Sequence, residues 1–361
     1  MTMKSLILFK TLTLLSFFLP IPFSMIANVP VIANTLNTPT NTEQPKRLKL
    51  TLSGHTAPVR ALTLSFNGQV LASGSDDKTI KLWNPTTGAL IRTLTGHRER
   101  IKSILITPDN QTLISTSFDN TIRFWNIQTG SEVRTIVEKT GVSAMLLTPD
   151  GQTLISGSGD RTIKFRNLKT RKIDRILKVE TTALAISRDG KTLYSGGENG
   201  GKIRVWNLVT GKQQSSFTPP LPRKEDLING SERASAPITL AVSNDGKMLL
   251  SGGYDDSFQS GGVRTTDGKS FKAWDLTTGK LVHNLSLGTS IDALIISPDS
   301  KTFITGGLGR EIILRDIKTT KSIMELTGHA GGIYGLAISS DSQILYSGSG
   351  DKSIKVWQIK P

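Results

Sequence analysis

The feature that most constrains the fold of this chain of 361 residues is an internal repeat of roughly forty residues. Similar segments recur seven times, among them SDDKTIKLWN (75–84), SFDNTIRFWN (117–126) and SGDKSIKVWQ (349–358). The tryptophan of each copy, or the residue that replaces it, stands at 83, 125, 166, 206, 274, 315 and 357, so the steps are nearly constant apart from one longer step between 206 and 274. Such a period indicates one small unit that must stack on its neighbours to bury its apolar surface.

Each repeat divides into four short segments in which apolar and polar residues alternate. In the first repeat these segments are 59–65, 69–75, 79–85 and 90–96, and the residues between them are rich in Gly, Asn and Asp. Alternation favours strands, and these residue types favour tight turns. The sequence therefore predicts an all-β protein with four strands in every repeat.

Pairs of Gly and His, together with the late tryptophan, point to a known family. Gly-His stands at 54–55, 96–97 and 328–329, and each pair is followed by a run of the Asp-x-x-Ile-x-x-Trp kind. In these features the chain resembles the WD-repeat family over residues 48–361. The phrases TPDGQTLISGS and SPDSKTFITGG resemble bacterial, and particularly cyanobacterial, members. The resemblance implies a seven-bladed β-propeller of four-stranded blades.

The ends of the repeat region predict how this ring closes. The last repeat stops after its third strand, whereas residues 47–54 (RLKLTLSG) form a strand candidate that has no repeat of its own. In the family the N-terminal strand usually completes the last blade, which removes an open sheet edge. We expect the same closure here.

Three repeats share four polar positions that invite comparison with a hydrolase triad. The separation of His from Asp is identical in the three repeats, and so are those of His from Trp and of Ser from Trp. A catalytic set has no reason to occur three times, and the resemblance implies buried hydrogen-bond chains that stiffen the blades. The sets are His55, Ser73, Asp77 and Trp83; His97, Ser115, Asp119 and Trp125; and His329, Ser347, Asp351 and Trp357.

Little else in the sequence indicates catalysis. The one remaining histidine, His283, is expected to be a surface or packing residue, the chain has no cysteine, and it has no HExxH motif or phosphate loop. Arg166 and Arg315 replace the tryptophan in repeats three and six, and repeats three to six lack the histidine. We predict a protein that is not an enzyme and has no cofactor or metal. The alternative is a propeller enzyme or ligand-binding domain that uses loop carboxylates such as Asp226 and Asp267.

Repeat five carries two insertions of equal length. The stretch from Trp206 to Ser243 is longer than its equivalent from Trp83 to Thr107, and the stretch from Ser251 to Trp274 exceeds that from Ser73 to Trp83 by the same amount. The insertions fall within 217–236 and 254–270, in loops that open on the same face of a WD-repeat propeller. We expect them to form one partner-binding patch, the alternative being two tolerated loops without a role. The candidate binding residues are Arg223, Lys224, Asp226, Tyr254, Asp255, Asp256 and Phe258.

Basic residues outnumber acidic ones by 44 to 29, which gives a net charge of +15. In most repeats Lys or Arg stands two residues before the tryptophan position, as in Lys164, where we expect its charge to lie at the rim of the blade. Residues 161–178 exceed this pattern and predict a basic rim on blade three, formed by Lys169, Arg171, Lys172 and Arg175. Such a rim suits an acidic protein or an anionic membrane, the alternative being solvated charge. Without interleaved aromatic residues, nucleic acid is a poor candidate.

The N-terminal residues have the order of a secretory signal. Lysines precede an uncharged, mostly apolar stretch (11–27), and small residues precede a possible cleavage before Asn34. We therefore expect a signal peptide, or else a membrane anchor, at 1–33, a flexible linker at 34–46 and the WD-repeat β-propeller at 47–361. The expected protein is exported to a periplasm, a thylakoid lumen or the extracellular space. It acts as a monomeric interaction scaffold for protein partners.

Overall fold

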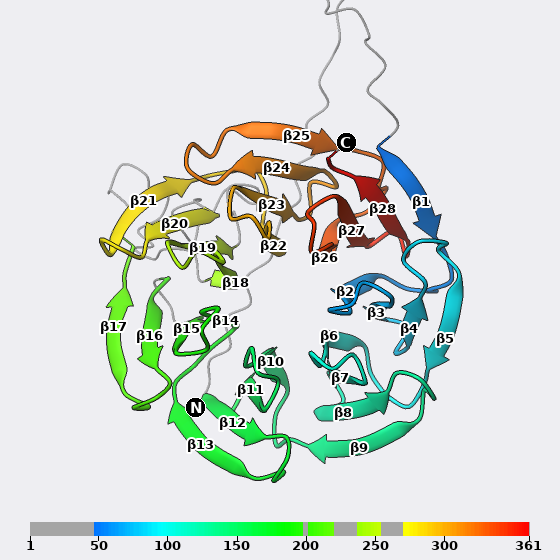
Figure 1. Ribbon diagram of the computed structural model, residues 1–361, viewed down its shortest axis with the longest axis horizontal. Helices are drawn as coiled ribbons and strands as arrows, with labels where there is room; N and C mark the ends of the chain where they lie inside the picture. Colours follow the sequence, from blue (N-terminus) through cyan, green and yellow to red (C-terminus); the bar gives the residue numbers. More distant parts are fainter. Residues whose placement is uncertain (1–46, 198–200, 220–236, 254–269, 361) are drawn as a thin grey trace, which may run out of the picture. The chain divides into compact units, whose positions relative to one another are not determined.

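The computed structural model describes residues 47–197, 201–219, 237–253 and 270–360, and these residues form strands and turns without a helix. The strands make seven antiparallel four-stranded sheets that stand around a ring as the blades of a propeller (Figure 1). This confirms the predicted seven-bladed β-propeller. The repeat spacing gave the number of blades because each repeat supplies one complete sheet, apart from the blade that closes the ring, and the family resemblance gave their arrangement as a propeller.

Within each blade the first strand lies nearest the ring axis and the fourth lies outermost (Figure 1). Blades one to three consist of β2 (Val59–Leu64), β3 (Leu71–Ser75), β4 (Ile80–Trp83) and β5 (Leu90–Leu94); β6 (Ile101–Ile106), β7 (Thr112–Ser117), β8 (Thr121–Asn126) and β9 (Glu132–Val137); and β10 (Val142–Leu147), β11 (Thr153–Ser158), β12 (Thr162–Asn167) and β13 (Ile173–Lys178). Blades four to six consist of β14 (Ala183–Ile186), β15 (Thr192–Gly196), β16 (Ile203–Asn207) and β17 (Gln213–Phe217); β18 (Pro237–Val242), β19 (Met248–Gly253), β20 (Phe271–Asp275) and β21 (Lys280–Leu285); and β22 (Ala293–Ile296), β23 (Thr302–Gly306), β24 (Ile312–Asp316) and β25 (Ser322–Leu326).

Blade seven joins the two ends of the repeat region. It consists of β26 (Ile333–Ile338), β27 (Ile344–Ser349), β28 (Ile354–Gln358) and the N-terminal strand β1 (Leu48–Leu52). β1 pairs with β28 in a register that sets Leu52 opposite Ile354 and Leu48 opposite Trp357. The predicted closure is therefore present, and hydrogen bonds between distant parts of the sequence seal the ring.

The core lies between the blades, since each sheet buries both faces against its neighbours. Every residue of β3 is buried, whereas the outer strand β5 is mostly exposed. The blades approach closely at Gly74 in β3, where a Cβ atom would lie 2.5 Å from Cγ2 of Ile101 in the next blade. Glycine is needed there because any side chain would force the two blades apart.

The two ends of each blade define two faces of the ring. In blade three, Val142 pairs with Ser158 and Ser158 with Thr162 at one end, while Arg166 pairs with Ile173 near the other. We call the face at which the first strands begin the upper face, and the opposite one the lower face. Turns between third and fourth strands therefore lie on the lower face.

Candidate functional site

The three histidine sets form continuous hydrogen-bond chains inside blades one, two and seven. In blade one, His55 Nδ1 lies 2.8 Å from Asp77 Oδ2 and His55 Nε2 lies 2.7 Å from Ser73 Oγ. Trp83 Nε1 donates to the same Ser73 oxygen at 2.8 Å. One assignment satisfies all of these atoms: Nδ1–H donates to the carboxylate and Nε2 accepts the seryl proton.

The sets of blades two and seven repeat this geometry. His97 contacts Asp119 and Ser115 at 2.8 and 2.7 Å, and His329 contacts Asp351 and Ser347 at 2.7 and 2.8 Å. The tryptophans Trp125 and Trp357 donate to the seryl oxygens, each at 2.8 Å. Ser73, Ser115 and Ser347 are all 0% exposed. A nucleophile must reach its substrate, so these buried hydroxyls serve the structure of the blade.

The titration of these sets predicts loss of stability in acid. Burial lowers the pKa of His97 and His329 below the usual 6.5, and this outweighs the adjacent carboxylates. Burial acts to raise the pKa of Asp119 and Asp351, but their hydrogen bonds outweigh it and lower both to about 2. In each case the unfolded chain binds more protons than the folded one, so the free energy of unfolding decreases as pH falls. The loss begins below pH 6.5 through the histidines and continues below pH 3.8 through the aspartates.

We expect the urea midpoint of unfolding to be highest at and above neutral pH and lower at pH 5. Tryptophan fluorescence at pH 8, 6.5, 5 and 4 measures it. A variant with His97→Gln and His329→Gln should be less stable at pH 8 but lose less between pH 8 and pH 5. A wild-type midpoint that stays level or rises towards pH 5 would contradict this assignment of protons.

Blade three contains a charged replacement for the histidine set. Arg166 takes the place of the tryptophan, and its Nη1 donates to Ser156 Oγ at 3.0 Å. Glu138, whose separation from Arg166 equals that between His and Trp in the complete sets, accepts from Arg166 Nη2. Lys164 Nζ bridges Glu138 Oε2 at 2.7 Å and Asp160 Oδ2 at 2.8 Å. The Glu138 side chain is 3% exposed, so the cluster is a buried ion network.

This network shows that the expected position of the Lys164 charge was wrong, and it includes Glu138, which was not identified from the sequence. The ammonium of Lys164 was expected at the rim of the blade, but Lys164 is only 9% exposed because its charge is neutralised inside the network. Glu138 was missed because the histidine position was checked only for the presence of histidine, and the residue that replaces it in blade three was not considered. Its place in the repeat, equivalent to the histidine of the complete sets, was the available signal.

The other incomplete blades keep less of the pattern. In blade four, Trp206 Nε1 still donates to Ser195 Oγ at 2.8 Å, although no histidine joins them. In blade six, Arg315 occupies the tryptophan position, and its buried Nε has no hydrogen-bond partner among the described residues. Of the blades whose inner positions are described, one, two, three and seven therefore carry the most extensive polar chains.

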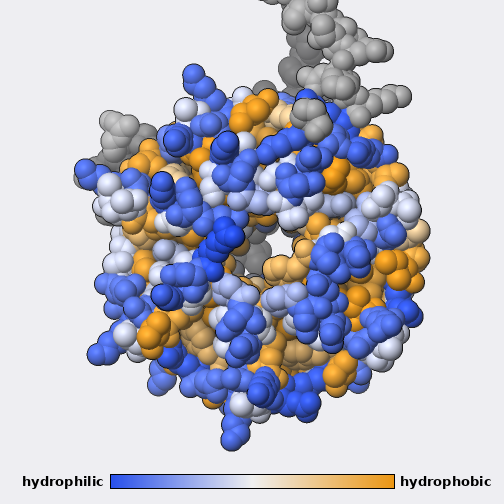
Figure 2. Space-filling model, in the orientation of Figure 1, coloured by the Kyte–Doolittle hydropathy of each residue, from blue (hydrophilic) through white to orange (hydrophobic). Residues whose placement is uncertain are grey.

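On the upper face, the central channel opens into a pocket of about 500 Å³ that is lined by residues of all seven blades. An opening at the centre of the ring is visible in Figure 2. One repeat position contributes a lining residue from every blade, and these residues are Arg60, Lys102, Ser143, Thr182, Ile238, Asp292 and Tyr334. In five blades the register of the first two strands shifts at this position. Such bulges redirect side chains, and in these five blades they turn the residue at this position toward the pocket. Thr182 and Asp292, the equivalent residues of blades four and six, line the pocket as well.

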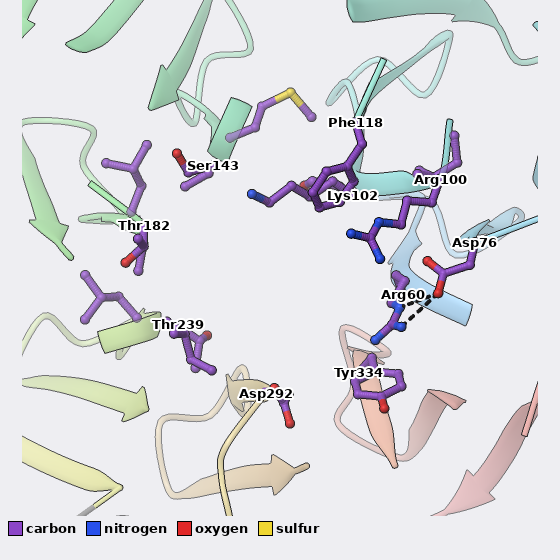
Figure 3. Close-up of a pocket in the computed structure, with 18 residues that line it drawn as sticks. Arg60, Asp76, Arg100, Lys102, Phe118, Ser143, Thr182, Thr239, Asp292 and Tyr334 are labelled. Atoms are coloured by element: carbon purple, nitrogen blue, oxygen red, sulfur yellow. Dashed lines mark hydrogen bonds and ion pairs between the residues drawn. The ribbon is translucent and has the colours of Figure 1, made fainter. Parts of the chain in front are cut away.

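Cations and aromatic rings gather on one side of this pocket, as Figure 3 shows. Arg60 Nη2 is paired with Asp76 Oδ2 at 2.8 Å, and the Arg60 guanidinium lies over the Tyr334 ring, 4.1 Å from its centroid. The Arg100 guanidinium lies over Phe118 at the same distance. The Lys102 ammonium lies 5.3 Å from the Phe118 centroid. These residues belong to blades seven, one and two.

Comparison with family models identifies the family to which this chain belongs. The family model described as WD domain, G-beta repeat matches residues 46–84, 88–126, 130–167, 177–207 and 320–358, which together make up more than half of the chain. The chain belongs to the WD40 repeat family. The hydrogen-bond chains described above are thus part of a WD40 propeller, and the resemblance stated from the Gly-His and Trp positions is confirmed.

Curated WD40 relatives match this protein over about half of its length. Ribosome biogenesis protein YTM1 of Scheffersomyces stipitis is 25% identical over 202 residues, which are 51% of this chain and 42% of that protein. Transcription factor unc-37 of Caenorhabditis elegans is 26% identical over 181 residues (49% and 26%), and the B-type cell cycle switch protein ccs52A of Medicago truncatula is 28% identical over 186 residues (51% and 34%). The chain covers less than half of each of these relatives.

The basic rim of this WD40 propeller lies on the lower face, away from the channel pocket. Lys169, Arg171 and Lys172 occupy the turn between β12 and β13 and are exposed. Arg175 differs from them, because its Nη1 donates to the carbonyl oxygen of Leu208 in blade four at 2.8 Å. Three of the four predicted rim residues are therefore exposed cations on the surface, whereas Arg175 connects blades three and four.

His283 has the same kind of role between blades five and six. Its Nε2 lies 2.8 Å from the carbonyl oxygen of Lys318 in the next blade. The arrangement resembles that of Arg92 in blade one, which donates to the carbonyl oxygen of Gln128 in blade two at 2.8 Å. His283 is thus placed as a packing residue at the outer edge of the ring.

The binding candidates of repeat five lie outside the described residues. They are Arg223, Lys224, Asp226, Tyr254, Asp255, Asp256 and Phe258, and Asp267 lies outside as well. The strand residues that flank the two insertions, Pro237 and Gly253, pair with each other at the upper end of blade five. Both insertions therefore join the blade at the upper face.

The described ranges also bear on metals and membranes. They contain no group of three or more His, Asp or Glu residues that could hold a metal ion. No helix in the same ranges is long and apolar enough to cross a membrane.

Proposed function

We propose that this WD40 protein is a non-catalytic scaffold that holds a protein partner on its upper face. The observation that carries the proposal is the channel pocket, where all seven blades supply a lining residue from one repeat position, which is bulged in five of them. Functional side chains on a rigid framework suit recognition because little conformational entropy is lost when a partner binds. The names of the relatives, which concern ribosome biogenesis, transcription and a cell-cycle switch, support a role among other proteins.

The histidine sets support a scaffold over an enzyme. Their seryl oxygens are buried, and each is already hydrogen-bonded to both a histidine and a tryptophan. The channel pocket holds the carboxylates Asp76 and Asp292, but its lining contains no histidine, and Asp76 is paired with Arg60. This chemistry recognises and orients a bound group better than it transfers protons.

Two further surfaces belong to the proposal. The strand residues that flank the insertions of repeat five pair at the upper end of blade five, and we propose that the insertions contribute to partner binding on this face. The exposed turn with Lys169, Arg171 and Lys172 lies on the lower face. It would serve a separate contact with an acidic partner or an anionic membrane.

Affinity capture with the full-length chain from an extract of its own host tests which face holds the partner. The upper-face variant carries Phe118→Ser and Tyr334→Ser, a loop variant has both repeat-five insertions shortened, and the lower-face variant carries Lys169→Ser, Arg171→Ser and Lys172→Ser. We expect quantitative mass spectrometry to show a prey that the upper-face variant loses by about tenfold or more, as for loss of a central contact worth over about 1.4 kcal/mol. The lower-face variant should retain this prey at moderate salt. If the lower-face variant loses every prey while the upper-face variant retains them all, the proposal that the partner binds on the upper face is rejected.

We also propose that the protein is exported by means of residues 1–33. The support is the order of lysines, apolar stretch and small residues in the sequence. The mature protein should begin at or near Asn34 and leave the cytoplasm. Cell fractionation followed by mass measurement of the purified protein tests this, and an intact cytoplasmic chain would refute it.

A further inference from the structure

The charge in the channel pocket is distributed unequally around the ring. Arg60, Arg100 and Lys102 come from blades one and two, and the Tyr334 and Phe118 rings stand beside them (Figure 3). Blades three and four contribute the small side chains Ser143 and Thr182, among others. We call the side with the cations, formed by Arg60, Arg100, Lys102, Phe118 and Tyr334, the cationic sector.

Two cations of this sector lack a counter-charge. Arg60 is neutralised by Asp76, to which its Nε and Nη2 donate at 2.9 and 2.8 Å. Among the described residues, neither Arg100 nor Lys102 forms an ion pair or a side-chain hydrogen bond, and both only border the Phe118 ring. The remaining carboxylate of the pocket is Asp292, whose Oδ2 accepts from Ser290 Oγ at 3.3 Å and whose pKa burial raises. Among the described residues, no carboxylate of the pocket therefore pairs with Arg100 or Lys102.

Lys102 is the more informative of the two cations. Burial, and then the charge of Arg100, lower the pKa of its ammonium. An ammonium that has lost part of its hydration without gaining a partner is destabilised, and an anion bound beside it would relieve that cost. Lys102 thus presents a partly buried ammonium that has no anionic partner among the described residues.

Arg100 is already held in position for an anion. Its guanidinium stacks on Phe118, with 4.1 Å between Cζ and the ring centroid, so the planar group has a defined orientation before anything binds. A guanidinium fixed in this way offers a fork that matches a carboxylate. Phe118 itself is 46% exposed, which leaves this edge of the pocket open to a partner.

The same stacking argues against nucleic acid as the occupant. Bases bind single-strand readers by stacking on aromatic faces. Here one face of Phe118 is covered by Arg100 and one face of Tyr334 by Arg60. A pocket of about 500 Å³ fits a few amino-acid side chains.

We infer that the cationic sector recognises an acidic segment of the partner protein, with Lys102 and Arg100 receiving Asp or Glu carboxylates. This inference rests on the proposed scaffold function and gives its upper face a ligand chemistry. The sector stands between blades seven, one and two, the blades that carry the complete histidine sets. The cations are thus displayed where the polar chains of the blades are complete.

Fluorescence anisotropy with two short peptides tests the inference. One peptide contains three glutamates between Gly-Ser flanks, the other has three glutamines, and both carry the same uncharged dye. With the full-length protein at low salt, we expect the glutamate peptide to bind and the glutamine peptide to bind at least about tenfold more weakly. Lys102→Met should weaken the glutamate peptide by about tenfold, and Lys102→Arg should retain its binding. Raising the salt should weaken it as well.

The matched control is Lys172→Met, which removes the same charge from the exposed lower-face turn and should leave the affinity unchanged. Equal weakening by Lys102→Met and Lys172→Met would show attraction by net charge alone and overturn the inference. So would equal binding of the two peptides, or tighter binding of a single-stranded oligonucleotide that depends on Lys102. If the peptides fail while Phe118→Ser with Tyr334→Ser still abolishes capture, the acidic chemistry is wrong and the upper-face scaffold stands.

Discussion

Replacing Glu138 by glutamine should destabilise the propeller by about 3 kcal/mol or more, since breaking a buried ion pair from one side leaves an uncompensated charge. Glu138 is 3% exposed on its side chain and contacts both Arg166 and Lys164. Glutamine keeps the size of the side chain but removes the negative charge, and Lys164 retains only Asp160 as a counter-charge. Urea or guanidinium denaturation, followed by tryptophan fluorescence, gives the change in the free energy of unfolding.

The control for this variant is Glu132→Gln in blade two. Glu132 also pairs with an arginine, Arg123, but its side chain is 34% exposed, so its loss should cost about 1 kcal/mol or less. A double variant with Glu138→Leu and Arg166→Leu should recover much of the lost stability, because it removes both buried charges while Lys164 keeps Asp160. Equal losses of unfolding free energy in Glu138→Gln and Glu132→Gln would show that the buried network of blade three contributes no more stability than an exposed ion pair.

Replacing Ser115 by alanine should cost about 2–6 kcal/mol, because a buried polar group left without a partner costs about 1–3 kcal/mol and this change leaves two such groups. Ser115 Oγ is bonded both to His97 Nε2 at 2.7 Å and to Trp125 Nε1 at 2.8 Å. All three residues are buried, so water has little access to replace the hydroxyl. Chemical denaturation at neutral pH measures the effect.

Blade four supplies the matched control for this second change. Ser195 is also buried, but among the described residues its hydroxyl accepts a side-chain hydrogen bond from Trp206 Nε1 alone, at 2.8 Å, without a histidine. Ser195→Ala should therefore cost about half as much as Ser115→Ala, or about 1–3 kcal/mol. If the two variants lose the same stability, the hydrogen bond between Ser115 and His97 contributes nothing. The stability lost would then come from the hydrogen bond to tryptophan alone.

The fold was predictable because its information is local and repeated. The tryptophan spacing located seven units, and the strand candidate at 47–54 without a repeat of its own matched the missing strand after Gln358. The positions of the histidine sets followed from constant spacing, which a repeat imposes on equivalent residues. Nothing about these inferences required knowledge of distances between blades.

The channel pocket was not found because its residues meet only when the ring closes. Arg60 belongs to the first repeat and Tyr334 to the last, yet the Arg60 guanidinium lies over the Tyr334 ring. The lining residues come from all seven repeats, so no contiguous motif marks the site. Comparison of the residue at one position across all seven repeats would have revealed the mixture of cations, hydroxyls and aromatic rings.

The basic rim was predicted from residues that are adjacent in sequence, but the structure does not place all of them on one surface. A run of charge in sequence suggested one surface, but Arg175 donates to Leu208 in the next blade while Lys169 and Lys172 remain exposed. Side chains in the outer strand alternate between the blade surface and solvent, which a charge count does not separate. The burial of Lys164 has the same origin, since its countercharge Glu138 comes from a different part of the repeat.

Site-specific photocrosslinking in the living host tests most directly whether the upper face holds the partner. The photoreactive amino acid benzoylphenylalanine would replace Phe118 at the channel pocket in one strain. In the other it would replace Val209, which is 73% exposed in a lower-face turn. We predict that position 118 gives a discrete crosslinked adduct of the upper-face partner and that position 209 does not give this adduct. An adduct from position 209 with none from position 118 would contradict the proposed function.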